Sequence, residues 1–225
     1  MAAPLHCRPG AYRLFAEAVS GIDAPGELLR GAVAISLHGL PQARLEAVLR
    51  RLELLAARIR RRARSGSESG YLAHLHAVLF DEERYRGDRE SYDDPRNSLL
   101  PTVLRRKQGI PVTLTLLYKE VGERIGLAIR GINSPAHFLA EVATRQGAML
   151  VDCFEGGRVL TRAEAFSRIE QAAGVTFARS EELLAPATNA QWLRRMLQNL
   201  KLSYARRDRP RDSQAMEELQ GLLPA

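Results

Sequence analysis

The sequence predicts an α+β fold in which helices precede and follow a small antiparallel sheet. Apolar residues recur at three- and four-residue steps in the first half of the chain, a spacing typical of amphipathic helices. After Gly126 the apolar pattern changes toward that of strands, and beyond residue 190 it becomes helical again. One buried helix followed by antiparallel strands is an α+β arrangement. With 225 residues, 45% of them hydrophobic, the chain is long enough to bury a substantial core.

The first half is expected to be a series of helices. A helix is predicted over residues 27–37 and is ended by Gly39 and Pro41. A longer helix follows, whose apolar stripe consists of Leu45, Val48, Leu49, Leu52, Leu55 and Ile59. The Ser- and Gly-rich residues 65–70 are expected to form a flexible connector to a further helix around residues 72–79.

Two stretches are expected to lack regular structure. Residues 81–96 are polar and rich in loop formers, and residues 1–10, which include Cys7, form a proline-rich terminus that is expected to be mobile. A short helix is predicted over residues 98–107.

The centre of the fold is predicted to be a strongly apolar helix over residues 112–125, which ends at Gly126. Pro111 suits the first position of this helix, where its missing N–H costs nothing. Three strands are expected next, at residues 127–133, 138–143 and 149–154, followed by a turn at Gly156 and Gly157.

The C-terminal stretch returns to helix. Its apolar face consists of Leu193, Met196, Leu197, Leu200 and Tyr204, and a second helix is predicted over residues 213–222. A helix pair of this size resembles one tetratricopeptide unit, which cannot bury its apolar face alone. We therefore divide the chain into residues 1–188 and a helical tail, 189–225, that must dock on the first part or on a partner.

His137 and Asp152 form the most interesting pair of polar residues. They lie on consecutive predicted strands, and side chains alternate faces along a strand. If the loop between the strands has an even number of residues, both side chains lie on one face, while Cys153 points to the other. The carboxylate can then fix the imidazole tautomer and leave the second ring nitrogen free as a base. Judged by spacing alone, a structural pair without a substrate is the favoured interpretation.

The segments around these two residues resemble those of transglutaminase-like cysteine enzymes. The resemblance is closest to a bacterial branch, the SirB group, in which a transglutaminase-like domain with a papain-like core precedes tetratricopeptide-like helices. It rests on Asn97-Ser98, Arg105-Arg106, Gly109-Ile110-Pro111, Gly126-Leu127, Pro135, the segments 137–142 and 151–154, Gly156-Gly157 and the segment 196–201. A similar domain occurs in a eukaryotic F-box protein.

The resemblance implies a cleft that contains His137 and Asp152 as the retained catalytic pair. It places Asn97, Ser98, Arg105, Gly109, Pro111, Thr113 and Thr115 at or near that cleft. In active members of the superfamily a Gly-x-Cys segment opens the central helix, about four turns before the glycine that ends it. Counting back from Gly126 puts Pro111 at the cysteine position.

No other residue is expected to replace the missing nucleophile. A helix N-terminus lowers the pKa of a thiol, which is why a cysteine suits this position, but proline has no nucleophile. Thr113 is rotated by about 200° around the helix from Pro111. Thr115 shares the face of Pro111 but lies one turn deeper, and an unactivated hydroxyl is a poor nucleophile.

Two functions follow as hypotheses. The first is a non-catalytic scaffold whose cleft and tail bind a protein or peptide partner. The second is an unconventional hydrolase or acyl-transfer enzyme that uses His137, Asp152 and a non-cysteine nucleophile or water. No cofactor is expected, and the sequence has no zinc signature, phosphate loop or nucleophile elbow. The oligomeric state stays open.

The composition also bears on whether the protein binds nucleic acid or metal, spans a membrane or is secreted. The net charge is +7, but the dense basic run at 58–64 ends a predicted helix, where cations suit the dipole, so nucleic-acid binding is disfavoured. His74 and His76 are two apart on a helix and make a poor metal pair. No stretch approaches the roughly 20 apolar residues of a membrane span, and residues 1–10 lack a secretory pattern, so a soluble cytoplasmic protein is expected.

Overall fold

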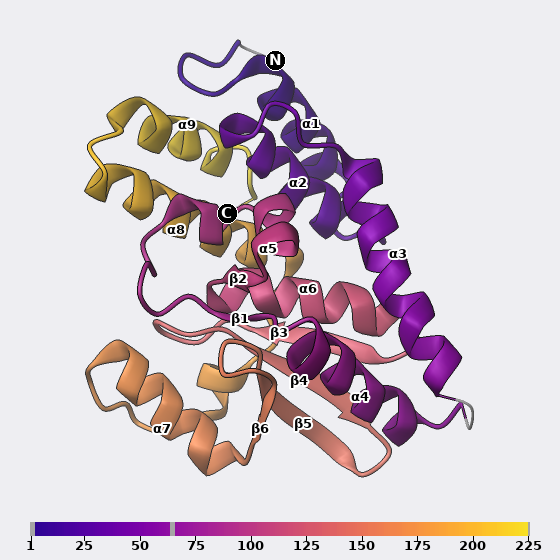
Figure 1. Ribbon diagram of the computed structural model, residues 1–225. Coiled ribbons are helices and arrows are strands. Elements are labelled where there is room, and N and C mark those ends of the chain that lie inside the picture. Colours follow the sequence, from indigo (N-terminus) through magenta and orange to yellow (C-terminus); the bar gives the residue numbers. More distant parts are fainter. Residues whose placement is uncertain (1–2, 64–65, 225) are drawn as a thin grey trace.

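A computed structural model of the chain describes residues 3–63 and 66–224. It confirms the α+β class: helices surround a four-stranded antiparallel sheet (Figure 1). The α-helices are α1 Pro9–Ser20, α2 Glu27–Gly39, α3 Leu45–Arg62, α4 Glu68–His76, α5 Leu100–Arg106, α6 Pro111–Arg124, α7 Arg162–Ala173, α8 Asn189–Arg206 and α9 Pro210–Gln220. The strands of the sheet are β3 Ala128–Ile132, β4 Leu139–Thr144, β5 Gly147–Asp152 and β6 Arg158–Leu160. None of the described helices combines the length and the apolar content that crossing a bilayer requires.

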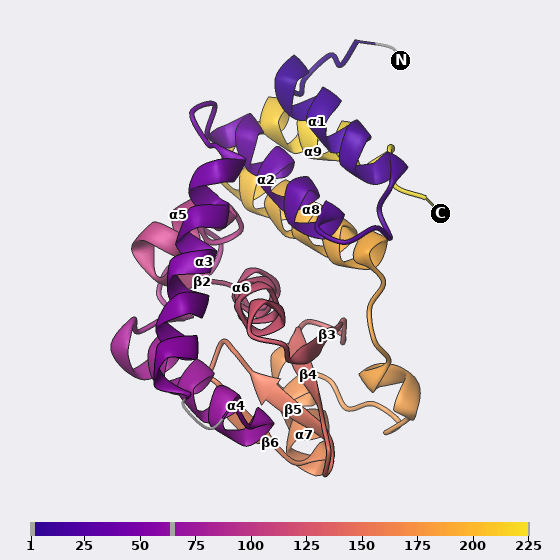
Figure 2. The ribbon, with the colours of Figure 1, turned by 90° about the vertical axis from the view of Figure 1, so that its right-hand side faces the viewer.

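Helix α6 lies at the centre of the molecule. Figure 2 shows it nearly end-on, between the helices α2 and α8 and the sheet, with α3 along one side. Eleven of its 14 residues are buried, so it is apolar almost all round. A helix of this kind is held by packing on every side rather than by one amphipathic stripe.

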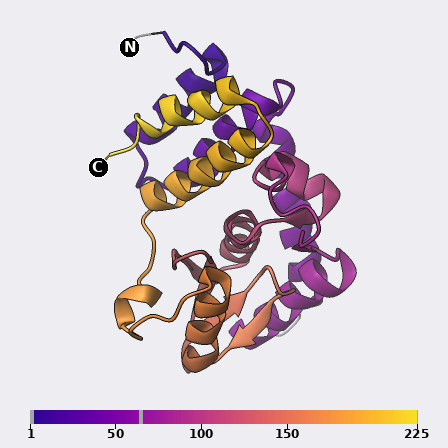
Figure 3. The same cartoon turned by 90° about the vertical axis from the view of Figure 1, so that its left-hand side faces the viewer.

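The sheet is a meander in the order β3-β4-β5-β6. Ala140 pairs with Val151, and both belong to the main core around α6. Leu139 and Leu150 belong to a second, smaller core with Phe166 of α7, because alternate side chains of a strand face opposite sides. Helix α7 therefore covers the face of the sheet that is turned away from α6 (Figure 3).

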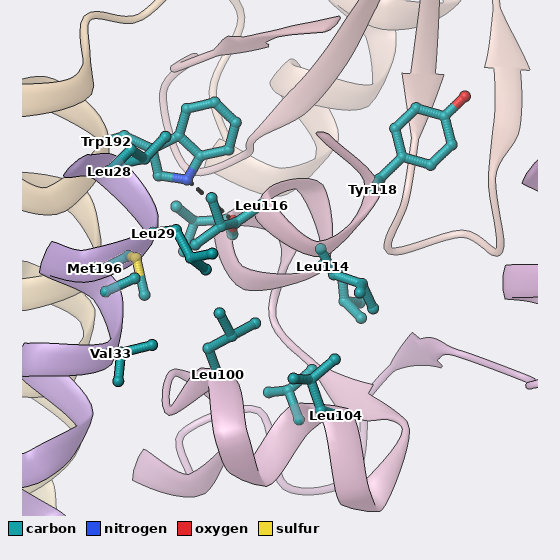
Figure 4. Packing of buried hydrophobic residues seen from close by; sticks show 14 of the residues in the cluster. Leu28, Leu29, Val33, Leu100, Leu104, Leu114, Leu116, Tyr118, Trp192 and Met196 are labelled. Carbon is teal, nitrogen blue, oxygen red and sulfur yellow. Dashed lines mark hydrogen bonds between the residues drawn. The ribbon is translucent and has the colours of Figure 1, made fainter. Parts of the chain in front are cut away.

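The C-terminal helix pair docks on the rest of the chain. A Cβ on Gly31 of α2 would lie 2.6 Å from Leu193, and one on Gly131 of β3 would lie 2.3 Å from Trp192. Only glycine permits α8 to come this close to both elements. The indole Nε1 of Trp192 donates a hydrogen bond to the carbonyl of Val112 at 3.2 Å, so α8 is also tied to α6 (Figure 4).

The N-terminal segment was expected to be mobile, but from Leu5 onward it is held against the rest of the chain. Residues from Pro9 form α1, and the side chain of Cys7 is buried in the main core. The carboxylate of Glu218 on α9 accepts hydrogen bonds from the backbone N–H groups of Leu5, His6 and Cys7 at 2.8–3.0 Å. The proline-rich composition suggested a loose end, but contacts with His38 of α2 and Glu218 of α9 hold it in place.

Two other expectations need correction. The connector predicted at 65–70 is shorter, because Ser67 caps α4 and the helix begins at Glu68; Ser65 lies outside the described residues. No element was predicted directly beyond the turn at Gly156 and Gly157, yet β6 and α7 follow there. Within residues 81–96 the structure contains β1 Arg86–Gly87, which pairs with β2 Gln108–Gly109.

Gly157 is expected to be indispensable for a steric reason that Gly156 lacks. Both have positive φ, at +67° for Gly156 and +80° for Gly157, but only at Gly157 would a Cβ meet Phe80, at 2.2 Å. Gly156→Ala should cost about 1 kcal/mol through backbone strain alone. Gly157→Ala should add roughly 1–3 kcal/mol for the overpacked ring. Urea unfolding measures the free energy of unfolding of both variants. If both lose the same free energy, the clash with Phe80 is not the reason that position 157 requires glycine.

The helical tail is expected to be part of the folded core. Trp192→Ala should lower the free energy of unfolding by about 3–5 kcal/mol, since a fully buried indole is lost. Leu202→Ala is the matched control on the same helix, because Leu202 is 49% exposed, and it should change stability by no more than about 0.5 kcal/mol. Similar effects of the two substitutions on thermal unfolding would show that α8 docks weakly.

Candidate functional site

His137 is held at the start of β4 by its backbone. It follows Ala136, which has a φ of +55°, an uncommon conformation for a residue with a side chain. The backbone N–H of His137 donates to the carbonyl of Ser134 at 3.3 Å, and its own carbonyl accepts from the guanidinium of Arg195 at 3.4 Å. The histidine is thus positioned by a turn on one side and by α8 on the other.

The imidazole and the carboxylate of Asp152 lie on one face of the sheet. Their Nε2 and Oδ2 atoms are 2.8 Å apart, and the residues are 3% and 0% exposed. The hairpin between Thr144 and Gly147 contains two residues, so the same-face arrangement expected for an even loop is the one observed. Among the described residues, no hydrogen-bond partner of the Nδ1 atom of His137 is found.

Asp152 is held in its ionised form. Burial by itself raises the pKa of a carboxyl group, but the hydrogen bond and charge of His137 and the nearby Arg168 outweigh it, so the pKa of Asp152 lies below its ordinary value. The Nε of Arg168 is 3.1 Å from Oδ2. Backbone N–H groups of Phe154 and Glu155 donate to Oδ1. An ionised carboxylate accepts from Nε2–H, which leaves Nδ1 as the basic nitrogen.

His137 borders a cleft of about 640 Å³, which we call the His137 cleft, whereas Asp152 is not among its lining residues. Pro111, the first residue of α6, lines the cleft together with His137. Phe154 forms an aromatic wall, with its ring edge-on to the imidazole at a centroid distance of 6.4 Å. Polar side chains of α7 and α8 complete the lining: Arg168, Gln171, Arg195, Gln198 and Asn199.

In the part of the chain that the structure describes, one cation of the cleft has no carboxylate partner. Arg89, Arg168 and Arg206 each form an ion pair with a carboxylate. Arg195 instead donates to Asn133 Oδ1 at 2.9 Å and to backbone carbonyls, and among the described residues no carboxylate pairs with it. Its burial lowers the pKa of its guanidinium, because a charge removed from water is disfavoured.

Neither cysteine thiol is available to the pair. Cys153 is fully buried, and its contacts are with Thr115 and Tyr118 on α6, on the side of the sheet away from Asp152. Burial raises its pKa well above the ordinary value. Burial likewise raises the pKa of Cys7 to about 12. A thiol with a raised pKa is a poor nucleophile at neutral pH.

The two threonines of α6 point into the core. The Oγ1 of Thr115 donates to the carbonyl of Phe138 at 3.5 Å. The Oγ1 of Thr113 is buried, and no hydrogen-bond partner for it is found among the described residues. Neither residue lines the His137 cleft, so both must be removed from the set of cleft residues that the resemblance implied.

Four other expected cleft residues also lie elsewhere. Asn97 is fully buried and donates through Nδ2 to Asp88 at 3.1 Å, while Ser98 is 1% exposed beside it. Gly109 packs beneath Val103. Arg105 lines a separate groove between α3 and α5. These residues shape the loop that leads into α6, and of the set only Pro111 reaches the cleft.

Sequence reasoning missed Arg168 and Arg195. Arg168 lies on α7, whose start is marked by a capping box between Thr161 and Glu164 that the sequence does contain. Arg195 lies on a helix that was expected, but its position in the cleft depends on how α8 docks. No spacing rule in the sequence indicates that docking.

His76 and three of the described arginines of the basic run have partners within the fold. In the described part of the chain no cluster of three potential metal-ligating side chains occurs. His76 Nε2 is instead 2.9 Å from the hydroxyl of Tyr118. In the basic run 58–64, Arg58 and Arg62 pair with Glu82, and Arg60 pairs with Glu53; Arg64 lies outside the described residues.

An α+β core with a buried central helix and a His–Asp pair at the ends of the two inner strands of its meander is the architecture expected of a transglutaminase-like protein. Residues 46–198 match the family model described as the transglutaminase-like superfamily. This match covers more than half of the chain, so the chain belongs to that superfamily. No solved structure matches the chain.

Curated relatives fall into two groups. A UPF0162 protein of Xylella fastidiosa is 32% identical over 157 residues, which are 68% of this chain and 56% of the relative. A UPF0162 protein of Pseudomonas aeruginosa is 28% identical over 201 residues, 87% of this chain and 73% of the relative. F-box only protein 21 of Mus musculus is 33% identical over 102 residues, 42% of this chain and 16% of the relative. The chain spans little more than half the length of the first of these relatives.

Stability in acid is expected to depend on Asp152. The folded-state pKa lies below the unfolded value of about 3.9, so its stabilising contribution is complete above that pH and is lost as the pH falls through the folded-state pKa. Asp152→Asn should therefore be less stable than the native chain at neutral pH and lose less on acidification from about pH 5 to pH 2. Asp23→Asn, at an exposed position, is the control. If the free energy of unfolding of the native chain and of Asp152→Asn falls in parallel as the pH is lowered, the ionisation of this carboxylate is not coupled to folding.

Proposed function

We propose that this chain is a non-catalytic binding module of the transglutaminase-like superfamily, and that the His137 cleft holds a segment of a protein partner. The observation that carries the proposal is Pro111 at the first position of α6, where it lines the cleft beside His137. By the resemblance, this is the position of the reactive cysteine in active members. A proline there removes cysteine-type transglutaminase and protease chemistry.

The lining of the cleft suits a peptide. Gln171, Gln198 and Asn199 carry side-chain amides, which both donate and accept hydrogen bonds and so match a peptide backbone. Arg195 supplies a partly buried cation without an acidic partner among the described residues. A buried charge is costly when unpaired, so an acidic group of the partner would stabilise it.

A second function has one observation in its favour. His137 retains a carboxylate partner on Nε2, and the other ring nitrogen has no partner among the described residues. This arrangement would let Nδ1 act as a general base toward a bound water, as in a hydrolase. The two functions are distinguished by the following experiments.

A cysteine introduced at position 111 tests whether this is the nucleophile position. In Pro111→Cys the new thiol would lie at a helix N-terminus beside His137, so its pKa should fall below the ordinary value of about 8.5. The rate of alkylation by iodoacetamide as a function of pH measures this pKa. The native chain, whose thiols are buried, serves as the blank. Adding His137→Gln should raise the pKa of the introduced thiol. If the thiol has an ordinary pKa that His137→Gln does not change, position 111 is not the nucleophile position.

Site-specific photo-crosslinking tests the binding module. A benzophenone side chain at Gln198, exposed on α8 in the cleft, should capture a defined protein from lysate of the host cell, whereas one at Gln146 in the β4–β5 hairpin should not. Capture should be lost when Ala172→Trp fills the cleft and should persist in His137→Gln.

The enzyme hypothesis predicts the opposite pattern. The native chain would then hydrolyse members of an ester and peptide panel, and His137→Gln would abolish turnover while the variant remains folded. Turnover of that kind, together with no capture at Gln198, would overturn the binding proposal.

A further inference from the structure

A second hollow, the α3–α5 groove, lies between the start of α3 and α5. It measures about 530 Å³ and shares no lining residue with the His137 cleft. Its floor is apolar and includes Leu40, Val48, Pro101 and Leu104. Figure 2 shows α3 and α5 side by side at this edge of the molecule. The groove is therefore a separate surface feature with its own chemistry.

The walls of the groove carry charge of one sign. Arg44, Arg51, Arg105 and Lys107 line it, and no aspartate or glutamate does. Arg51 and Lys107 both contact the carboxylate of Glu83, so these two groove cations share one acid, which Arg58, outside the groove, contacts as well as Glu82. The groove therefore has an excess of positive charge above an apolar floor.

Arg44 and Arg105 contribute most to this excess. Both side chains are exposed, and neither has an ion pair or hydrogen bond with any described residue. They stand on different helical elements, Arg44 at the start of α3 and Arg105 near the end of α5. A ligand that lies in the groove would thus meet an unpaired cation on each side.

We propose that the α3–α5 groove binds an amphipathic helical segment of a partner protein, with acidic residues flanking an apolar face. A helix that docks in a groove places apolar side chains at i, i+3/i+4 and i+7 on the floor. From Arg44 to Arg51 the lining extends over roughly 10 Å, about two turns of such a partner helix. Its acidic flanks would pair with Arg44 and Arg105.

The composition of the groove argues against nucleic acid. Single-stranded nucleic acids bind through bases stacked on aromatic side chains, and no aromatic residue lines the groove. The apolar floor would also be left uncovered by a sugar–phosphate backbone. The inference is independent of the proposed function, because it holds whether or not the His137 cleft is catalytic.

A selection experiment tests the proposal without presupposing a sequence. The full chain is used to select binders from a phage-displayed library of random 16-residue peptides, and the selected peptides are synthesised with a fluorophore for anisotropy. The expected peptides combine apolar residues at helical spacing with Asp or Glu, and their helicity rises on binding. Absence of binders, or peptides without acidic residues, would overturn the proposal.

Matched variants locate the binding. Arg44→Glu combined with Arg105→Glu should weaken the selected peptides at least tenfold, and Ala47→Trp, which fills the groove from an exposed position, should do the same. Arg50→Glu combined with Arg61→Glu is the control, because these exposed arginines lie on α3 outside the groove and the change in net charge is the same. The control should retain affinity within twofold.

Other occupants give recognisable outcomes. If the groove double variant and the control double variant lose the same peptide affinity, binding depends on net charge alone, and this result would overturn the proposal. So would tighter binding of vesicles containing phosphatidylserine, or of single-stranded DNA, than of any selected peptide. His137→Gln should leave peptide binding unchanged, so failure in the His137 cleft and failure in the α3–α5 groove are distinguishable.

Discussion

The burial of α6 is the constraint on which the rest of the structure depends. Because nearly every side of this helix is apolar, it requires the sheet on one side and helices on the others. The sheet supplies Val142 and Val151, and α8 supplies Trp192, whose indole also bonds the first turn of α6. Once α6 is enclosed in this way, its N-terminal residue necessarily emerges where the sheet edge and α8 meet.

The candidate site is a consequence of that enclosure. His137 and Asp152 are brought together by the short β4–β5 hairpin, which is a local event. Pro111 and Arg195 reach the same cleft only because α6 and α8 pack against the same sheet. The cleft thus combines a locally determined pair with residues contributed by distant segments, and this is why its chemistry was only partly visible in the sequence.

The proposed function and the groove inference describe surfaces of different character. The His137 cleft is rich in amides and contains Arg195, a partly buried cation without an acidic partner among the described residues, whereas the α3–α5 groove has an apolar floor and exposed cations. Both features are suited to protein partners with acidic groups. The resemblance assigned Arg105 to the cleft, but in the structure Arg105 of α5 lines the α3–α5 groove. Its place in the sequence motif does not reveal which surface it serves.

The sequence alone predicted the α+β class and the helices α2, α3, α6 and α8, because periodicity is a local property. It predicted the shared face of His137 and Asp152 only for a hairpin loop with an even number of residues, and the structure supplied that number. It did not reveal that the N-terminal segment is held in place, with Cys7 buried in the main core. Nor did it place Thr113, Thr115 and Asn97, which proved to be core residues rather than cleft residues. Only the tertiary structure decided these points, since the side of a helix or loop that faces a cleft depends on what packs against its other side.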